Sequence, residues 1–415
     1  MRILVVDVNF DYKNPIYRQF YTSLLSCMEV DFFGPGYVSR DCLEKGIRRF
    51  MNKNDRYDAI LLGNYFVYTV GEKGTRYNAY HTHRHTLPYY KINDAYQCCG
   101  KIYEELKDIR DVIKIFSYYE DNCSMPLGDK AICEQLIDCG FYILSFPIEH
   151  MERYSIKIRN KYQYLTNYAY ELAENYNMQY IPITILGIGY HEIFVRNFFD
   201  RDYEWCVPGN KAEWFYPERN KAQKIMEQGQ KKIWSDDPFQ LLSVETIRRE
   251  NIEWYWFRNE AEKILSWMWG KNDIIASRPK MQYIAACREQ YLESMRSSKF
   301  VYAEAGVGNQ MVRKYFEACA CGAVLVAKRV PGMNETGFVH GKNCIIVENC
   351  EEIAGINALY TENQMKQIAI NGQRLIIDKH MFVHRADALK RTIETIVQGM
   401  YKGAYWENGN YVIKE

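Results

Sequence analysis

Residues 299–322 read KFVYAEAGVGNQMVRKYFEACACG, and this stretch decides the fold class. Its first part, Phe300–Ala303, is a short apolar run, which is typical of a strand buried on both faces. A loop with two glycines follows, and the spacing of apolar residues then predicts a helix over Met311–Cys321. A buried strand, a glycine loop and a helix in this order predict a βα unit of a parallel sheet.

The same alternation of short apolar runs and helical stretches extends over most of the chain. Further strands are predicted at Ile3–Val8, Ala59–Leu62, Val112–Phe116, Tyr142–Phe146, Ile181–Ile185, Glu204–Val207, Lys231–Trp234, Ala323–Ala327 and Cys344–Val347. Helices are predicted at Ile16–Met28, Tyr96–Ile109, Lys130–Ile137, Tyr162–Tyr176, Arg219–Gln228, Met281–Met295, Glu351–Leu359, Glu362–Asp378 and Phe382–Gln398. Strands and helices that alternate in this way predict an α/β fold with doubly wound parallel sheets.

The alternation pauses at Leu186–Tyr190, a stretch with two glycines, and then resumes with a new strand. We therefore expect two α/β domains, residues 1–190 and 191–398, and a C-terminal tail at 399–415 that can cross back to the first domain. Ligands bind outside the carboxyl ends of parallel strands. Two such domains that face each other therefore predict a central cleft.

The composition limits the function classes. The chain has 415 residues, and 53 Lys and Arg against 52 Asp and Glu give a net charge of +1, which argues against a basic surface over the whole molecule. The 13 cysteines follow no disulfide framework, so we expect reduced thiols and a cytoplasmic protein. No run approaches the about 18 apolar residues of a membrane-spanning helix, while peripheral membrane contact stays open.

The loop and helix of the quoted stretch carry the chemistry. The glycines of Gly306–Asn309 let the backbone approach a ligand, and the free N–H groups of the helix that follows suit a phosphate. Arg313 and Glu317 are four residues apart and share one helix face. One interpretation is a surface ion pair. The other is a nucleotide site in which Arg313 holds a pyrophosphate and Glu317 accepts hydrogen bonds from ribose hydroxyls.

The segment Arg313–Gly322, followed by Ala-Val-Leu-Val, resembles the R-x-x-F-E-A-x-A-x-G signature of GT-B glycosyltransferases of the CgeB-like or "glycosyl transferases group 1" type. The likeness continues through Pro331–Phe338, Gly341–Val347, Ile368–Arg374 and His384-Arg385. A second patch, Val207–Asn210 followed by Tyr216–Arg219, is similar to the opening of the family's C-terminal domain. The resemblance covers about residues 205 to 395.

This resemblance implies a GT-B fold, in which two Rossmann-like domains face a cleft and the C-terminal one holds a nucleotide-sugar donor such as a UDP- or GDP-sugar. The donor-binding residues would be Gly306, Gly308, Asn309, Gln310 and Arg313 at the diphosphate, Glu317 at the ribose, and Arg219 at the edge of the cleft. Such enzymes generally need no metal and no cofactor, because helix N-termini and basic side chains neutralise the leaving diphosphate. Related retaining families carry a second glutamate eight residues before the ribose-binding one. Asn309 occupies that position here, so the stereochemistry stays open.

The N-terminal half is expected to bind the acceptor, which would be a glycan, a lipid-linked group or a protein. A hexosyl transfer is the expected reaction. If the reaction inverts the anomeric centre, the catalytic base should come from the N-terminal domain, where it faces the cleft. The candidates for this base are Glu120, Asp121 and His191.

Two other functions remain open from the sequence. The first is a glycosyltransferase of the same fold that modifies a nucleic-acid base, for which Arg248-Arg249 and the 153–159 stretch would supply local basic clusters. The second is a nonenzymatic GT-B-like binding protein, which Asn309 favours. The alternate histidines His81, His83 and His85 suit a metal or an acceptor-binding loop, and the loop is favoured.

Overall fold

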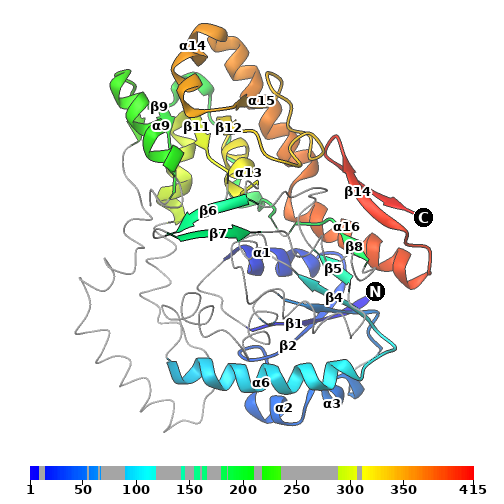
Figure 1. The fold of residues 1–415 in the computed structure, drawn as a ribbon. Helices are drawn as coiled ribbons and strands as arrows, with labels where there is room; N and C mark the ends of the chain where they lie inside the picture. Colours follow the sequence, from blue (N-terminus) through cyan, green and yellow to red (C-terminus); the bar gives the residue numbers. More distant parts are fainter. Residues whose placement is uncertain are drawn as a thin grey trace.

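A computed structural model describes residues 1–8, 15–53, 56–63, 66, 89–117, 142–144, 154–158, 161–165, 179–184, 186–209, 217–234, 288–305 and 311–415. These residues form two parallel sheets with helices around them (Figure 1). The expected α/β class with doubly wound sheets is confirmed. In the described part of the chain, no helix is long and apolar enough to cross a membrane.

The first sheet has the strand order β2-β1-β3-β4-β5-β8, and all neighbouring strands are parallel. Its strands are β1 (Arg2–Val6), β2 (Glu29–Phe33), β3 (Ala59–Leu62), β4 (Ile113–Ser117), β5 (Tyr142–Leu144) and β8 (Tyr180–Ile181). The helices in this part of the chain are α1 (Pro15–Leu24), α2 (Arg40–Glu44), α3 (Ile47–Asn52) and α6 (Tyr89–Lys107). The buried apolar strands β1 and β3 lie side by side in the middle of the sheet, as their continuous apolar sequence predicts.

Two elements of this half differ from the prediction. Strand β2 was not expected, because charged residues interrupt its apolar pattern. One of them, Asp31, is neutralised by Arg2 at 2.8 Å and accepts a hydrogen bond from the Tyr57 hydroxyl, also at 2.8 Å. The helix predicted from Tyr162 is wrong at its start, because β6 (Tyr154–Ile158) and β7 (Lys161–Leu165) form an antiparallel pair. The alternation of apolar and polar residues in Lys161–Leu165 suits a strand.

The second sheet has the order β10-β9-β11-β12-β13 and is also parallel. Its strands are β9 (Tyr203–Cys206), β10 (Ile233–Trp234), β11 (Ser298–Ala303), β12 (Val324–Lys328) and β13 (Ile345–Val347). The helices are α9 (Pro217–Gln228), a helix over residues 288–296, α13 (Arg313–Ala320), α14 (Ile356–Leu359) and α15 (Glu362–Lys379). Short 3₁₀ helices lie at Tyr190–Glu192, Phe198–Asp200 and Cys350–Gly355.

The two sheets share one topological feature. In each, the first strand in sequence, β1 or β9, lies between the second and the third, so that the connections leave in opposite directions. The gap between β1 and β3, or between β9 and β11, is the topological switch point at which ligands bind in open α/β sheets. These two positions are therefore the first places to examine for a site.

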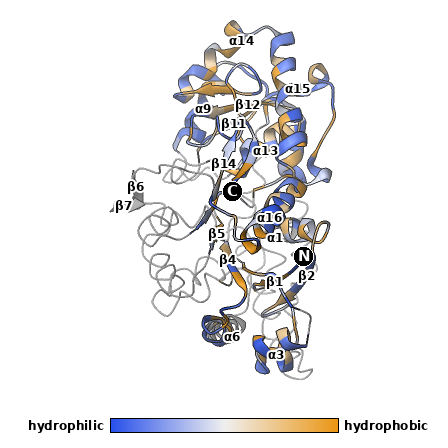
Figure 2. Cartoon of the chain, turned by 90° about the vertical axis from the view of Figure 1, so that its right-hand side faces the viewer, coloured by the Kyte–Doolittle hydropathy of each residue, from blue (hydrophilic) through white to orange (hydrophobic). Residues whose placement is uncertain are grey.

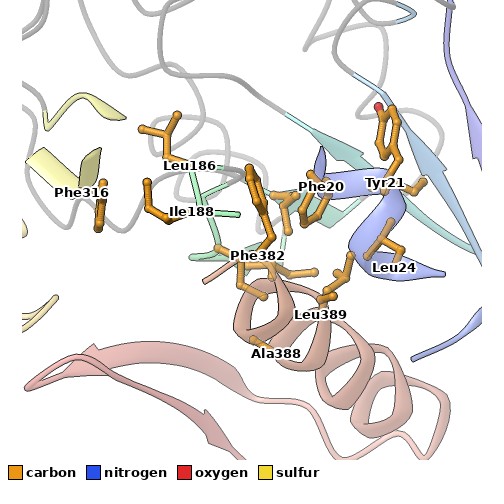
Figure 3. Packing of buried hydrophobic residues seen from close by; sticks show 14 of the residues in the cluster. Phe20, Tyr21, Leu24, Leu186, Ile188, Phe316, Phe382, Ala388 and Leu389 are labelled. Carbon is orange, nitrogen blue, oxygen red and sulfur yellow. The ribbon is translucent and has the colours of Figure 1, made fainter. Parts of the chain in front are cut away.

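Helix α16 (Phe382–Val397) returns from the second sheet and packs against α1 of the first half (Figure 1). Its start is fixed by the Phe382 N–H, which donates to the Ile188 carbonyl at 2.9 Å. Apolar side chains from both halves meet here, and Figure 3 shows them: Phe20, Tyr21, Leu24, Leu186, Ile188, Phe316, Phe382, Ala388 and Leu389. Helices α15 and α16 alternate between hydrophilic and hydrophobic residues along their length (Figure 2), as expected of helices that cover a core on one side.

The chain ends in an antiparallel hairpin of β14 (Gly403–Glu407) and β15 (Asn410–Lys414). Trp406 Nε1 donates to the Pro182 carbonyl at 2.5 Å, and the Tyr401 hydroxyl donates to the Tyr180 carbonyl at 2.7 Å. The Gly409 N–H donates to the Glu335 carbonyl at 2.9 Å. The hairpin therefore contacts β8 of the first sheet and a loop of the second half. The domain boundaries at residues 190 and 398 stay predictions.

Candidate active site at the second switch point

The candidate site lies where β9 and β11 end. Pro208 and Gly209 follow β9, and Glu304 follows β11. The N-termini of α9 and α13 come next in the chain after these two strands. Carboxyl ends of strands and N-termini of helices therefore meet at the switch point of the second sheet, where backbone N–H groups and helix dipoles favour an anion.

Glu304 links the end of β11 to the start of α9. Its carboxylate accepts hydrogen bonds from the N–H groups of Glu218, at 3.3 Å, and Arg219, at 3.1 Å, and so caps the start of α9. Burial raises the pKa of Glu304, and this effect exceeds the opposing effect of the Arg219 charge. Arg219, which the resemblance places at the donor site, is itself buried, and its Nε lies 3.9 Å from the Glu304 carboxylate.

Lys314, in the first turn of α13, brings a second basic side chain to the same place, where burial and the charge of Arg219 lower its pKa well below the ordinary value. Its Nζ donates to the Pro208 carbonyl. A Cβ atom added to Gly209 would lie 2.7 Å from this Nζ and 3.1 Å from Nη1 of Arg219. Both basic side chains therefore border the space beside Gly209, a residue whose φ of 104° also favours glycine.

Arg313 points away from this cluster, toward the connection between the halves. Its Nη2 pairs with Glu192 at 2.6 Å and donates to Gln19 Oε1 of α1 at 3.1 Å. Its Nε donates to the Gly187 carbonyl at 3.2 Å, and its guanidinium lies 5.6 Å from the centre of the Phe382 ring. Arg313 thus links α13 to residues 187–192, which connect the two halves, and to α1 of the first half.

Glu192 is the centre of this link. It is fully buried at the end of a 3₁₀ helix and pairs with both Arg313 and Arg288. Burial raises its pKa, but the charges of Arg313 and Arg288 and the Gly189 N–H outweigh burial, so the pKa lies below the ordinary value. Glu192 is therefore a carboxylate at neutral pH.

Glu317 completes the network from α13. Its Oε2 accepts from the Tyr291 hydroxyl at 2.7 Å, and its Oε1 lies 3.3 Å from Arg288 and 3.5 Å from Arg313. Burial and the neighbouring Glu317 raise the pKa of Tyr291 well above its ordinary value, so this hydroxyl stays protonated and donates. Since Arg313 and Glu317 are buried, the interpretation of the pair as a surface ion pair is wrong.

The chain is similar to known proteins in part of its sequence and in its fold. Residues 267–391 match a family model described as "Glycosyl transferase-like". Among solved structures, the fold is similar to sucrose-phosphate synthase from Thermosynechococcus elongatus, with 10% identity, 96% of this chain and 100% of that chain covered, and a TM-score of 0.50. Anabaena HepE in complex with UDP and glucose is matched over 95% of this chain and 100% of that chain, with 11% identity and a TM-score of 0.49. No curated protein matches the chain.

The chain has a GT-B fold, and its residues 267–391 are similar to glycosyl transferases. The matched family segment contains β11, α13 and the strands and helices that follow, up to α16. It therefore includes Lys314, Glu317 and Arg313, whereas Glu192 and Gln19 lie outside it.

His191 is the one base candidate among the described residues. It is exposed, and its Nε2 lies 3.1 Å from Nε2 of Gln19, whose Oε1 contacts Arg313. The other two base candidates, Glu120 and Asp121, lie outside the described residues. So do the donor-loop residues Gly306, Gly308, Asn309 and Gln310, and the histidines at 81, 83 and 85.

The sequence did not point to several residues of the site. Gln19, Glu192, Arg288 and Tyr291 carry no local motif, and only the fold brings them to α13. The sequence did contain a signal for Lys314. Two adjacent basic residues begin α13, and the N-terminus of a helix carries a partial positive charge. This arrangement is unfavourable unless an anion lies near.

One group of described residues has the spacing of metal ligands, namely Glu218, Cys350 and Glu351. The exposed Glu351 pairs with Lys221, and the Cys350 thiol lies 3.5 Å from Glu351. Burial, together with Glu218 and Glu351, raises the pKa of this thiol to about 12. Because Glu351 is exposed and already pairs with Lys221, we assign no metal to this group.

Proposed function

We propose that the enzyme transfers a hexosyl group from a nucleoside-diphosphate sugar to a glycan, lipid-linked or protein acceptor. The observation that carries this proposal is the set of buried charged side chains at the second switch point, where Arg219 and the first turn of α13 meet beside Gly209. A diphosphate is the part of the donor that such a site would stabilise. The likeness of Arg313–Gly322 to the glycosyltransferase signature supports the same donor class.

Glu317 is the proposed partner of the ribose. A carboxylate has about four lone-pair positions. Tyr291 and Arg288 each use one of them, so Glu317 keeps capacity to accept hydrogen bonds from ribose hydroxyls. The buried setting also strengthens such bonds, because water does not compete there.

For the diphosphate we propose Arg219, the first turn of α13 and the loop with Gly306, Gly308, Asn309 and Gln310. Arg313 has a different part in this proposal. Because its guanidinium is held by Glu192, Gln19 and Gly187, we propose it as a positioning residue that keeps α13 and Glu317 in place against the first half.

We further propose that the reaction needs neither a metal ion nor another cofactor. Fixed cations and helix N-termini are able to neutralise the developing charge on the leaving diphosphate. The acceptor would bind on the first half, with Glu120, Asp121 or His191 as the base. The described cysteines are free thiols, which supports a reducing, cytoplasmic setting.

A thermal-shift panel of UDP, GDP, ADP and their sugar derivatives tests the donor class. A ligand at roughly 100 times its Kd adds about 2.7 kcal/mol to the free energy of unfolding, which raises the melting temperature measurably. If no nucleoside diphosphate stabilises or binds the protein, the proposed donor site is wrong.

Glu317→Ala tests the ribose contact by titration calorimetry with the nucleoside diphosphate that binds. We expect about tenfold weaker binding or more, because hydrogen bonds to a charged group are lost. Glu317→Gln keeps an acceptor for Tyr291 and separates this loss from damage to the network. Glu362→Ala, at an exposed carboxylate paired with Lys299, is the matched control and should bind as the parent does. Unchanged affinity in both Glu317 variants would remove this residue from the donor site.

A further inference from the structure

Gln19 of α1 contacts residues from two other parts of the chain. Its side-chain oxygen Oε1 accepts a hydrogen bond from Nη2 of Arg313 at 3.1 Å, and its side-chain nitrogen Nε2 lies 3.1 Å from Nε2 of His191. A guanidinium has only donors, so Arg313 determines which end of the Gln19 amide is the oxygen. Arg313 is itself held in place by the buried Glu192, at 2.6 Å. The amide nitrogen of Gln19 therefore faces the imidazole of His191.

This contact determines the tautomer of the exposed His191. The amide nitrogen of Gln19 only donates, so Nε2 of the imidazole has to accept and carries no proton. A neutral imidazole then carries its proton on Nδ1. The one lone pair of the two ring nitrogens is thus used by Gln19, and the group that His191 offers to a substrate is the Nδ1–H donor.

The chain makes room for the Nδ1 side of this ring. A Cβ atom added to Gly189 would lie 2.7 Å from Cε1 and 2.8 Å from Nδ1 of His191. Gly189 has a φ of −84° and a ψ of 153°, a backbone conformation that any residue adopts. Glycine is therefore needed here by the imidazole and not by the backbone. The His191 carbonyl also accepts from Nη2 of Arg296 at 3.3 Å, which fixes the backbone that carries the ring.

The other histidines in the described part of the chain have the opposite arrangement, because in each of them Nδ1 is an acceptor. Its donor is the Ile346 N–H for His340, the Met381 N–H for His384, and Nη2 of Arg385 for His380. In His380 the proton on Nε2 is then donated to the Thr336 carbonyl at 2.7 Å. Burial and the charge of Arg385 lower the pKa of His380 well below its ordinary value, so this ring is neutral. His191 thus differs from the other described histidines in the nitrogen that carries its proton.

We propose that Gln19 is a positioning residue that keeps His191 as the Nδ1–H tautomer. In this form His191 donates a hydrogen bond to an oxygen of the substrate and is not the catalytic base, because a base needs a free lone pair. The tautomer does not depend on the proposed function, but its effect on the reaction rests on that function. Glu120 and Asp121 then remain as the candidates for the base.

Long-range ¹H–¹⁵N correlation spectra of the full-length protein with ¹⁵N-labelled histidine test the tautomer. They are recorded at about pH 8.5, well above the about 6.5 of an ordinary histidine. His191→Gln identifies the His191 signals by their loss. We expect His191 of the parent to show a protonated Nδ1 and a bare Nε2, while the reverse pattern, expected for His380, gives a reference in the same spectrum. A protonated Nε2 in His191 of the parent would show that the proposal is wrong.

Gln19→Glu replaces the donor by an acceptor. A carboxylate only accepts, so Nε2 of His191 should then carry a proton. Gln367→Glu, at an exposed glutamine of α15 that contacts Asn371, is the matched control with the same change of charge. It should leave the His191 signals as they are in the parent. A bare Nε2 in Gln19→Glu would overturn the role of Gln19, and the parent spectrum decides the tautomer even if this variant fails to fold.

Hydrolysis of the nucleotide sugar that stabilises the protein most tests the effect on the reaction. His191→Ala should lower turnover about tenfold, the cost of one hydrogen bond, and His191→Asn, whose amide N–H lies near the position of Nδ1, should recover part of this loss. Loss of a catalytic base costs about 10²–10⁴-fold. A loss of about 10²-fold or more in both variants would therefore identify His191 as the base and overturn the proposal. If the parent binds none of UDP, GDP and ADP, the proposed function fails, while the spectrum still decides the tautomer.

Discussion

The two switch points of the molecule have the same backbone topology, but the described side chains beside their glycines differ: an acid at the first and two basic residues at the second. At the first, between β1 and β3, Asp7 follows β1, and its carboxylate accepts from the Tyr21 hydroxyl at 2.6 Å, the Val8 N–H at 2.9 Å and the Phe66 N–H at 2.8 Å. A Cβ atom on Gly63, after β3, would collide with this carboxylate. The first switch point is thus filled by an acid that the chain itself satisfies.

At the second switch point a glycine again makes room, but the side chains beside it are Arg219 and Lys314. The topology of an open parallel sheet therefore determines where a ligand can bind. The few residues that follow each strand determine the chemistry of that binding site. An acid that is already hydrogen-bonded stabilises the loops around it. Two basic side chains border the second glycine, and the Glu304 carboxylate beside them caps the start of α9.

The largest effect is expected in the network that joins the two halves. Glu192→Ala leaves the buried Arg313 and Arg288 without this carboxylate and should lower the free energy of unfolding by about 3–5 kcal/mol. Urea denaturation of parent and variant measures the difference. Glu362→Ala, at an exposed ion pair, should cost less than about 1 kcal/mol.

The same variant has a defined pH dependence. The pKa of Glu192 is lowered in the folded protein, so its contribution is fully present above the about 4.3 of an unfolded glutamate and is lost as the pH falls toward the folded value. The stability difference between parent and Glu192→Ala should therefore shrink below about pH 4.3. A difference that stays constant down to pH 3 would show that the charge of Glu192 is not what stabilises the network.

The second prediction separates the two switch points. Asp7→Ala leaves buried N–H and O–H donors without their acceptor and should cost about 3 kcal/mol of stability. It should change the affinity for a nucleoside diphosphate little. Lys314→Met should instead lower that affinity and change the stability little. Asp7→Asn, which keeps one acceptor oxygen, is the milder control. A loss of diphosphate affinity in Asp7→Ala as large as that in Lys314→Met would contradict the distinction between an acidic structural site and a cationic ligand site.

The smallest effect is expected at the C-terminal hairpin, which lies at the β8 edge of the first sheet, away from both switch points. Trp406→Phe removes the hydrogen bond to the Pro182 carbonyl and should lower stability by about 1 kcal/mol, seen in thermal or urea unfolding. Tyr401→Phe removes the comparable bond to Tyr180 and should have a similar effect. Both variants should bind nucleoside diphosphates as the parent does, and a tenfold change in that affinity would show that the hairpin acts on the donor site.

Much of the fold was predictable because its signals are local. The apolar runs at β1, β3 and β12 correspond to predicted strands, since strands buried on both faces are apolar along most of their length. Strand β2 was not predictable because Asp31 is paired with Arg2 and accepts a hydrogen bond from Tyr57, and both partners lie far from it in the sequence. The antiparallel strand β7 was not predictable because its alternation of polar and apolar residues covers only five residues, too few to distinguish a strand from the start of a helix.

The sequence by itself determined the βα unit of residues 299–322, the α/β class, and the pairing of Arg313 with Glu317 on one helix face. It did so because strand burial and the 3.6-residue helical repeat act between neighbours in the chain. Only the tertiary structure decided which way each side chain of α13 turns. Arg313 meets Glu192 and Gln19, which are 121 and 294 residues away, and Lys314 meets Pro208, 106 residues away. Contacts over such separations depend on how the two sheets pack, and no local pattern encodes them.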